Sequence, residues 1–302
     1  MLINDPLIKE LNKYYESKSD LNIEQMIPGL KTIISDNIKD TISNILAELF
    51  EQSKKDAFYT FPISGQTNEF THKSVLYSDH NYDLSISIIN KHELDNYKEH
   101  SHQNIEQRGI GFYGKHQFSY FLNSGSLKAN IWEYPLASSR LDELDLSNLM
   151  CKKVKMETFK DDDSIYLAPN QTMIYKESLK NTTMVSIDFK QDTYPLDLMF
   201  SAKSRKLKHQ NPTHAEATRI QFYCNLLKKM DYQDAIPSLK KLLSHDLYFI
   251  RWTAMQELLG LDAYSVLQEL NEMSLKDKHP EVRSAAAETL VMIDNIEATH
   301  AH

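Results

Sequence analysis

The chain has 302 residues, of which 41% are hydrophobic and 25% are charged, a balance typical of folded globular proteins rather than disordered ones. The net charge of -8 argues against a general nucleic-acid binder, because phosphate binding needs a concentrated basic surface. No apolar run approaches the roughly 20 residues that cross a bilayer, so we expect no membrane span. The first residues lack the pattern of a signal peptide, and two cysteines, Cys151 and Cys224, are too few for a disulfide framework. We therefore expect a cytoplasmic protein with free thiols.

The first zone of the chain, residues 1–57, is predicted to be helical. Apolar residues from Leu30 to Phe50 recur at steps of three and four, which is the pattern of one face of a long amphipathic helix. A shorter helix is predicted over residues 6–16, with Asp5 as its N-cap and Pro6 at its first position.

The second zone, residues 58–195, is predicted to be a β-domain. It consists of short runs rich in β-branched and aromatic residues, separated by clusters of Asn, Asp, Ser and Gly. The alternation is clearest in residues 83–89, where Leu84, Ile86 and Ile88 would share one face of a strand. Many short strands with turn-rich spacing favour a sandwich or a barrel.

The third zone, residues 196–302, is predicted to contain helical repeats. The stretch HDLYFIRWTAMQELLGLD matches DKHPEVRSAAAETLVMID at an offset of 32 residues. The same offset pairs Ala254 with Ala286, so we expect both to be buried where consecutive helices cross. A helical repeat of this length indicates an α-solenoid.

These two stretches resemble the second helices of HEAT-type repeats. Pro280 stands at the start of such a helix, and Arg251 and Arg283 stand at the Arg position. The resemblance implies a surface that docks a protein partner or covers the neighbouring domain as a lid.

A pair of histidines provides the main functional signal in the β zone. His100 and His102 would point to the same side if they lie on a strand, and Glu106 follows four residues later. Imidazole suits Fe, Mn, Zn, Ni and Cu, and two histidines with one carboxylate form a facial ligand set with open positions opposite. The alternative is a polar surface loop that binds no metal.

The same stretch, followed by glycines at positions 109, 111 and 114, resembles the first motif of the cupin superfamily and, more loosely, the thiol dioxygenases. The turn at Pro169 resembles the second cupin motif, which normally leads to another histidine ligand. Here that position falls near Ile174 or Tyr175, so a further ligand would have to come from elsewhere, and His116 on the next strand is the candidate. The predicted fold is therefore an α+β multidomain chain: N-terminal helices, a cupin-like β-barrel and a C-terminal HEAT-like α-solenoid.

The resemblance implies a metal-dependent oxygenase or hydroxylase that uses Fe(II) or another divalent transition metal on a small amino-acid-like or thiol substrate. Arg108 and Tyr113 would anchor the substrate, and Tyr175 would stand where the missing ligand belongs. The alternative is a non-catalytic, degenerate cupin that serves as a ligand sensor or as a protein-interaction scaffold through its repeats. The absent second-motif histidine favours this alternative.

Overall fold

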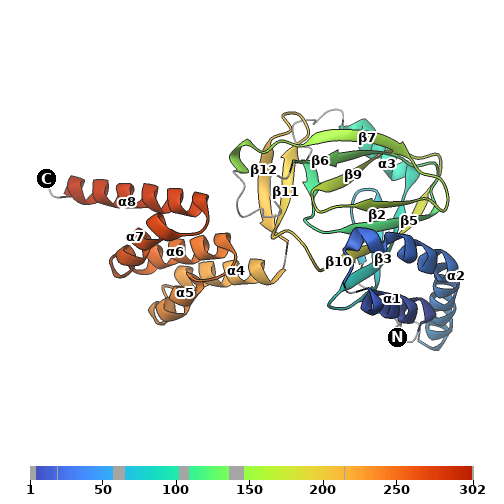
Figure 1. The fold of residues 1–302 in the computed structure, drawn as a ribbon, viewed down its shortest axis with the longest axis horizontal. Helices are drawn as coiled ribbons and strands as arrows, with labels where there is room; N and C mark the ends of the chain where they lie inside the picture. Colours follow the sequence, from blue (N-terminus) through green and yellow to red (C-terminus); the bar gives the residue numbers. More distant parts are fainter. Residues whose placement is uncertain are drawn as a thin grey trace. The chain divides into compact units, whose positions relative to one another are not determined.

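A computed structural model describes residues 5–18, 20–56, 65–101, 109–135, 146–213 and 215–300. The chain divides into two compact units, one built mainly from the N-terminal helices and the strands, the other containing the C-terminal helices (Figure 1). None of the described helices has the length and apolar character that a bilayer-spanning segment requires.

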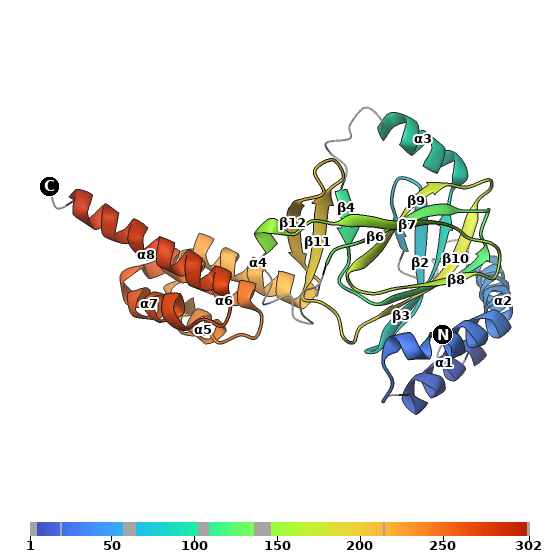
Figure 2. The same ribbon diagram turned by 45° about the horizontal axis from the view of Figure 1, so that its top comes forward.

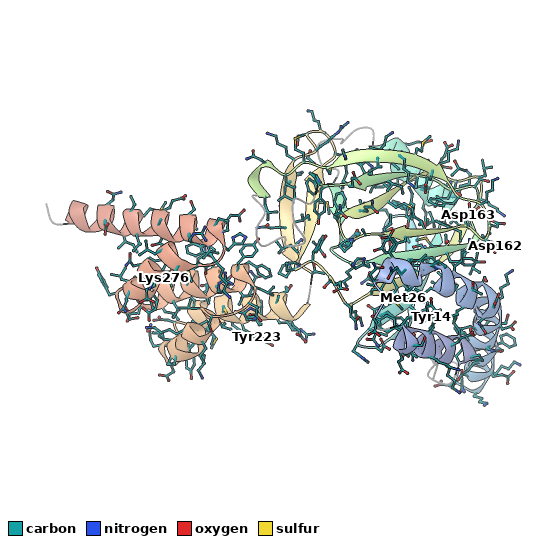
Figure 3. All side chains as sticks on the ribbon, in the orientation of Figure 1. Tyr14, Met26, Asp162, Asp163, Tyr223 and Lys276 are labelled. Atoms are coloured by element: carbon teal, nitrogen blue, oxygen red, sulfur yellow. The ribbon has the colours of Figure 1, made fainter. Side chains whose placement is uncertain are left out.

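Two helices open the chain, as the apolar spacing predicted. Helix α1 (Pro6–Ser17) begins after Asp5, whose carboxylate accepts a hydrogen bond from the Leu7 amide at 2.9 Å. Helix α2 (Ile23–Lys55) begins with a reciprocal capping box between Asn22 and Gln25. The Tyr14 hydroxyl donates to the Met26 carbonyl at 3.2 Å and so ties the two helices together (Figure 3).

The largest sheet has six antiparallel strands in the order β1-β2-β3-β10-β5-β8. Their bounds are β1 (Gly65–Thr67), β2 (Thr71–Ser78), β3 (Tyr82–Ile89), β10 (Thr182–Phe189), β5 (Gln117–Asn123) and β8 (Ser164–Leu167). Strands β3 and β10 pair along their whole length, so the residues of each pair point to the same face.

Two three-stranded sheets complete the β region (Figure 2). The first has the order β7-β6-β9, with the bounds β7 (Lys152–Thr158), β6 (Lys128–Glu133) and β9 (Gln171–Glu177). The second has the order β12-β11-β4, with the bounds β12 (Leu207–Pro212), β11 (Leu196–Ser201) and β4 (Gly109–Phe112). Phe121 and Met184 of the six-stranded sheet pack in one cluster with Ala129 and Met173 of the β7-β6-β9 sheet, so these two sheets face each other. The predicted order of N-terminal helices, β region and C-terminal helical repeats is confirmed, and among the described residues the strands of the β region are assigned to three sheets.

The six-stranded sheet therefore has two covered faces. Its inner face looks toward the β7-β6-β9 sheet, and its outer face is covered by α1 and α2 (Figures 1 and 2). The outer face contributes a set of buried apolar side chains: Tyr82, Leu84, Phe118, Tyr120, Val185, Ile187 and Phe189. These pack with the apolar stripe of the two helices, including Leu30, Ile34 and Ile38.

Two parts of the β zone differ from the prediction. Residues 91–101 form helix α3 (Lys91–Ser101) instead of part of a strand and loop. The Asn90 side chain accepts hydrogen bonds from the amides of His92 and Glu93, and Leu94 is buried, so the segment has a cap and an apolar anchor as a helix. Strands also continue beyond residue 195, because β11 and β12 add a further hairpin before the first repeat helix, α4, begins at Ala215.

The C-terminal helices repeat as predicted. They are α4 (Ala215–Lys229), α5 (Ile236–Leu242), α6 (Tyr248–Asp262), α7 (Leu267–Lys276) and α8 (Pro280–His300), with short 3-10 turns at Gln233–Ala235 (η4) and Tyr264–Val266 (η5). A further 3-10 turn, Leu146–Asn148 (η3), lies between β6 and β7. Ala254 and Ala286 are fully buried, as expected for close helix contacts. Cys151 and Cys224 are buried free thiols, which confirms the absence of a disulfide between them.

The Arg position of the repeat has a structural role. The Arg251 guanidinium donates to both carboxylate oxygens of Asp277, at 2.6 and 2.8 Å, and to the carbonyls of His245 and Asp246. Arg283 likewise donates to the Asp277 carbonyl at 2.6 Å. The arginines therefore hold the loops that precede their own helices.

Candidate ligand-binding site on the inner face of the sheet

The centre of the inner face is lined by small hydroxyl side chains. Ser85 and Ser87 on β3, Ser119 on β5 and Ser186 on β10 are all buried and alternate with the apolar residues of the outer face. The hydroxyls of Ser119 and Ser186 lie 2.9 Å apart, and that of Ser85 donates to the Ser186 carbonyl at 3.4 Å. Small side chains at these positions leave room for longer ones from neighbouring strands.

An ion pair crosses this layer of serines. Lys73 on β2 donates to Asp188 on β10 at 2.6 Å, reaching over the intervening strand β3. Gln117 on β5 donates its amide to the other carboxylate oxygen of Asp188 at 2.7 Å. The side chains of Lys73 and Asp188 keep 27% and 17% of their surface exposed, so this pair remains accessible to solvent.

A second ion pair lies at the same end of the sheet. Lys190 contacts Asp83 at 2.7 Å, and Asp83 is the direct neighbour of Asp188 across the β3–β10 pairing. Burial raises the pKa of Asp83, but hydrogen bonds from Lys190 and Ser78 outweigh it and hold this pKa below its usual value. This end of the inner face thus carries two carboxylates, each with its own lysine.

The other end of the inner face is apolar, and Tyr175 on β9 of the facing sheet packs against this apolar cluster. Its hydroxyl is 3.8 Å from the Met184 sulfur, and its ring meets the edge of Phe70. Burial raises the pKa of Tyr175, and the charges of Tyr113 and Asp188 raise it further. The phenol is therefore protonated at neutral pH.

The other predicted substrate-anchoring residues are less clearly placed. Tyr113 follows β4 and is 66% exposed. Arg108, His102 and Glu106 lie outside the described residues. His100 occupies the last turn of α3, and its side chain also lies outside the described part. Because successive helical residues turn by about 100°, the argument that a strand aligns His100 with His102 does not hold at His100.

His116 was expected to lie near these histidines, but the structure places it against the outer face. Its ring stacks on Tyr166 and its Nδ1 is 2.5 Å from the Tyr166 hydroxyl, and Tyr166 packs with the α1–α2 cluster. Burial lowers the pKa of His116, although Asp192 and Glu24 partly counteract this. His116 therefore faces away from the inner site, and within the described ranges no three His, Cys, Asp or Glu side chains form a group that could hold a metal.

Sequence reasoning missed Lys73, Gln117 and Asp188. The available signal was the polar half of each alternating strand, such as Gln117 and Ser119 in β5 or Ser186 and Asp188 in β10. Such residues ordinarily mark a solvent-facing side. Only the position of the helices on the apolar side shows that these polar residues face another sheet.

Comparisons with known proteins match two parts of the chain. Residues 214–291 match a family described as HEAT repeats, and no curated protein sequence matches the chain. An RmlC-like cupin from Shewanella frigidimarina is similar over 44% of this chain and 90% of its own, at 8% identity and a TM-score of 0.25.

Two further solved structures match smaller parts of their own chains. EutQ from Clostridium difficile is similar over 41% of this chain and 64% of its own, at 5% identity and a TM-score of 0.23. Streptomyces albus HEPD, with Fe(II) and 2-hydroxyethylphosphonate bound, is similar over 42% of this chain and 24% of its own, at 10% identity and a TM-score of 0.27. This chain thus spans less than two thirds of either protein, and these remote likenesses transfer no activity to it.

The chain combines N-terminal helices, a β region of three sheets, and C-terminal helices of which residues 214–291 match a family described as HEAT repeats.

Proposed function

We propose that the β region binds a small amino-acid-like molecule on the inner face of its six-stranded sheet. The observation that carries this proposal is the solvent-accessible pair of Lys73 and Asp188 beside an apolar cluster. A molecule that bears an ammonium and a carboxylate matches both charges of the pair, since Lys73 would bind the carboxylate and Asp188 the ammonium.

The surroundings favour exchange of the internal ion pair for a ligand. Gln117 holds one oxygen of Asp188, so the carboxylate stays oriented when Lys73 turns toward another partner. The serines beneath the pair are buried and bonded to one another, which gives the site a rigid floor. A zwitterion that inserts between Lys73 and Asp188 leaves neither charge unpaired, so it avoids the cost of a buried lone charge.

The apolar end of the inner face suits the side chain of such a ligand. Phe121, Met173 and Met184 form an apolar surface there, and Tyr175 packs against it with its hydroxyl 3.8 Å from the Met184 sulfur. A thiol or thioether group would suit this apolar surface, since sulfur packs favourably against aromatic rings.

An oxygenase or hydroxylase activity forms the second step of the proposal. His100, His102 and Glu106 would hold a divalent metal, of which iron is the first candidate, while Arg108 and Tyr113 would help to anchor the ligand. Such a metal supplies Lewis-acid and redox chemistry when bound. His116 is left out of this ligand set because it faces the helix-covered side of the sheet.

A ligand sensor without catalysis is the second candidate. The observation that favours it is the second turn of the cupin resemblance, where Met173 and Tyr175 project into the inner cluster and no histidine is present. In this version the ligand binds in the same place, and the response is passed on through the HEAT repeats.

The first experiment tests ligand binding by isothermal titration calorimetry of the full chain with free amino acids, including cysteine. Each is compared with its N-acetyl and amide forms, which lack one of the two charges. We expect binding only of the zwitterion, and at least about tenfold weaker binding in Lys73→Met, since a hydrogen bond to a charged group contributes roughly 1.5–3 kcal/mol. Lys128→Met, which breaks an exposed ion pair with Glu177, is the matched control. Equal binding by both variants would refute the proposal.

The second experiment separates the enzyme from the sensor. Metal content is measured in protein purified without added metal and in the His100→Ala/His102→Ala double variant. Oxygen consumption is then followed with the ligand found above. Stoichiometric metal that the double variant loses, together with ligand-dependent oxygen uptake, supports the oxygenase. Ligand binding with neither metal nor oxygen uptake supports the sensor.

A further inference from the structure

Helix α4 carries an apolar face that the other described helices of its own unit leave uncovered. Phe222, Tyr223, Leu226 and Met230 recur at helical spacing, and each is between 39% and 65% exposed. The Met230 amide still bonds to the Leu226 carbonyl, so the helical turn continues through the last of them. Figure 3 shows Tyr223 projecting from α4. Four large apolar side chains on one helix are more than the scattered exposure of an ordinary surface.

The next repeat shows how the equivalent face of its helix is buried. Gln221 bonds to Thr253 and Asn225 bonds to Glu257, and both pairs are 32 residues apart, which is the repeat length. Helix α4 is therefore the equivalent of α6 in the preceding repeat. At the same offset, Phe222, Tyr223 and Leu226 correspond in order to three residues of α6 that are fully buried: Ala254, Met255 and Leu258.

The difference between α4 and α6 is the helix that precedes each in the chain. Helix α5 precedes α6 and packs against it, and α7 packs in the same way against α8. Strand β12 precedes α4, so this chain does not supply the first helix of the α4 repeat from its adjoining sequence. The exposed apolar residues of α4 lie where that missing helix would pack.

Positive charges beside the apolar residues of α4 restrict which partner helix could bind there. Arg219 and Lys229 are exposed and lie on the same side of α4 as the apolar residues, one toward each end. Neither has an ion-pair partner among the residues that the structure describes. The nearest carboxylate of the helix, Glu216, precedes this stretch. The surface is thus apolar along its centre and positively charged at both ends.

We propose that the α4 face, defined by Arg219, Phe222, Tyr223, Leu226, Lys229 and Met230, binds an acidic amphipathic helix of a protein partner. The ten-residue step from Arg219 to Lys229 corresponds to about 15 Å of helix, so the partner needs about three turns with a carboxylate near each end. A second copy of this chain would present the same two cations in place of those carboxylates. This inference is independent of the ligand proposed for the β region.

The test uses the full-length chain and a synthetic twelve-residue helical peptide with leucines on one face and glutamates at both ends. Binding is followed by fluorescence anisotropy. We expect at least about tenfold weaker binding in Phe222→Asp and in Arg219→Gln/Lys229→Gln, and weaker binding of a matched peptide in which glutamine replaces glutamate. Leu275→Asp alters an exposed apolar residue of α7 and serves as the control that keeps full binding.

Three results would overturn the proposal. The first is equal binding of the glutamate and glutamine peptides, or no loss in the α4 variants. The second is a wild-type dimer in sedimentation experiments that Phe222→Asp dissociates, because the face would then join two copies of the chain. The third is a marked drop in melting temperature for Phe222→Asp relative to Leu275→Asp, because a truly exposed position tolerates polar substitution within about 0.5 kcal/mol.

Discussion

The two faces of the six-stranded sheet are built from the same strands but differ in chemistry. On β10, Val185, Ile187 and Phe189 point outward and are buried under α1 and α2, whereas Ser186 and Asp188 point inward. The outer face consists of large apolar groups in close contact with two helices. The inner face carries hydroxyls and two ion pairs beside a smaller apolar cluster, against which Tyr175 of the facing sheet packs.

This difference separates stability from function within single strands. A face that removes apolar area from water contributes to the free energy of folding roughly in proportion to that area. A face of hydrogen-bonded polar groups contributes little net stability. Each group loses its hydration when it is buried, and its hydrogen bond within the protein only offsets that loss. The inner polar residues therefore add little to the stability of the fold, and a role in ligand binding would account for their presence.

The largest expected effect is on the outer face. Phe118→Ala should lower the free energy of unfolding by roughly 3–5 kcal/mol, because a fully buried ring is removed and the helices close only part of the space. Urea denaturation followed by circular dichroism measures this value. Leu179→Ala, at a residue that is 77% exposed, should change stability little. A small effect of Phe118→Ala would mean that α1 and α2 do not cover this face in solution.

A smaller effect is expected at the inner ion pair. Asp188→Asn keeps the shape of the side chain but leaves Lys73 without its carboxylate, so we expect a loss of about 1–3 kcal/mol in the same denaturation experiment. Ligand binding should be lost as well. Glu177→Gln removes an exposed partner of Lys128 and should change stability little, because solvent screens an exposed ion pair. If Asp188→Asn preserves ligand affinity, the inner face is a structural rather than a binding surface.

The serine layer should show a still smaller effect. Ser186→Ala removes one hydroxyl that contacts Ser119, and the expected loss is about 0.5–1.5 kcal/mol. The exposed Ser53 on α2 is the control, since its hydroxyl only bonds to a carbonyl of its own helix. A loss of unfolding free energy as large as that of Phe118→Ala would show that the two faces contribute equally to the stability of the sheet.

The two faces should also lose their contributions to the free energy of unfolding at opposite ends of the pH range. The pKa of Asp83 is lowered, so its contribution is present above its usual value near 4 and is lost as pH falls below it. Burial, with Asp79 and Tyr77, raises the pKa of Tyr82 on the outer face, so its contribution is present below pH 10 and is lost above it. Denaturation at several pH values should show that Asp83→Asn flattens the acid decline and Tyr82→Phe the alkaline one. The reverse assignment would contradict the placement of these residues.

Much of the architecture was readable because it is encoded in local spacing. The steps of three and four from Leu30 to Phe50 predicted α2, and the 32-residue offset predicted the repeats and the burial of Ala254 and Ala286. Helix α3 was missed because its cap, Asn90, and its single buried anchor, Leu94, make a weak periodic signal inside a zone of strands.

The candidate site could not be predicted in the same way. Lys73, Gln117 and Asp188 come from three strands, and Asp188 is 115 and 71 residues from the other two along the chain. Of the residues predicted from the cupin resemblance, Tyr175 lies on the inner face and His116 does not, because the helices cover the side of the sheet that His116 contacts.

The sequence by itself determined the two N-terminal helices, most of the strands, the position of the repeats, and which residues of a strand share a face. Alternation with a period of two divides a strand into an apolar and a polar side, but it carries no information about what covers either side. Only the tertiary structure decided that α1 and α2 cover the apolar side and that a second sheet faces the polar one. For this physical reason the residues that sequence patterns assign to solvent, Ser85, Ser119, Ser186 and Asp188, form the interior of the β region.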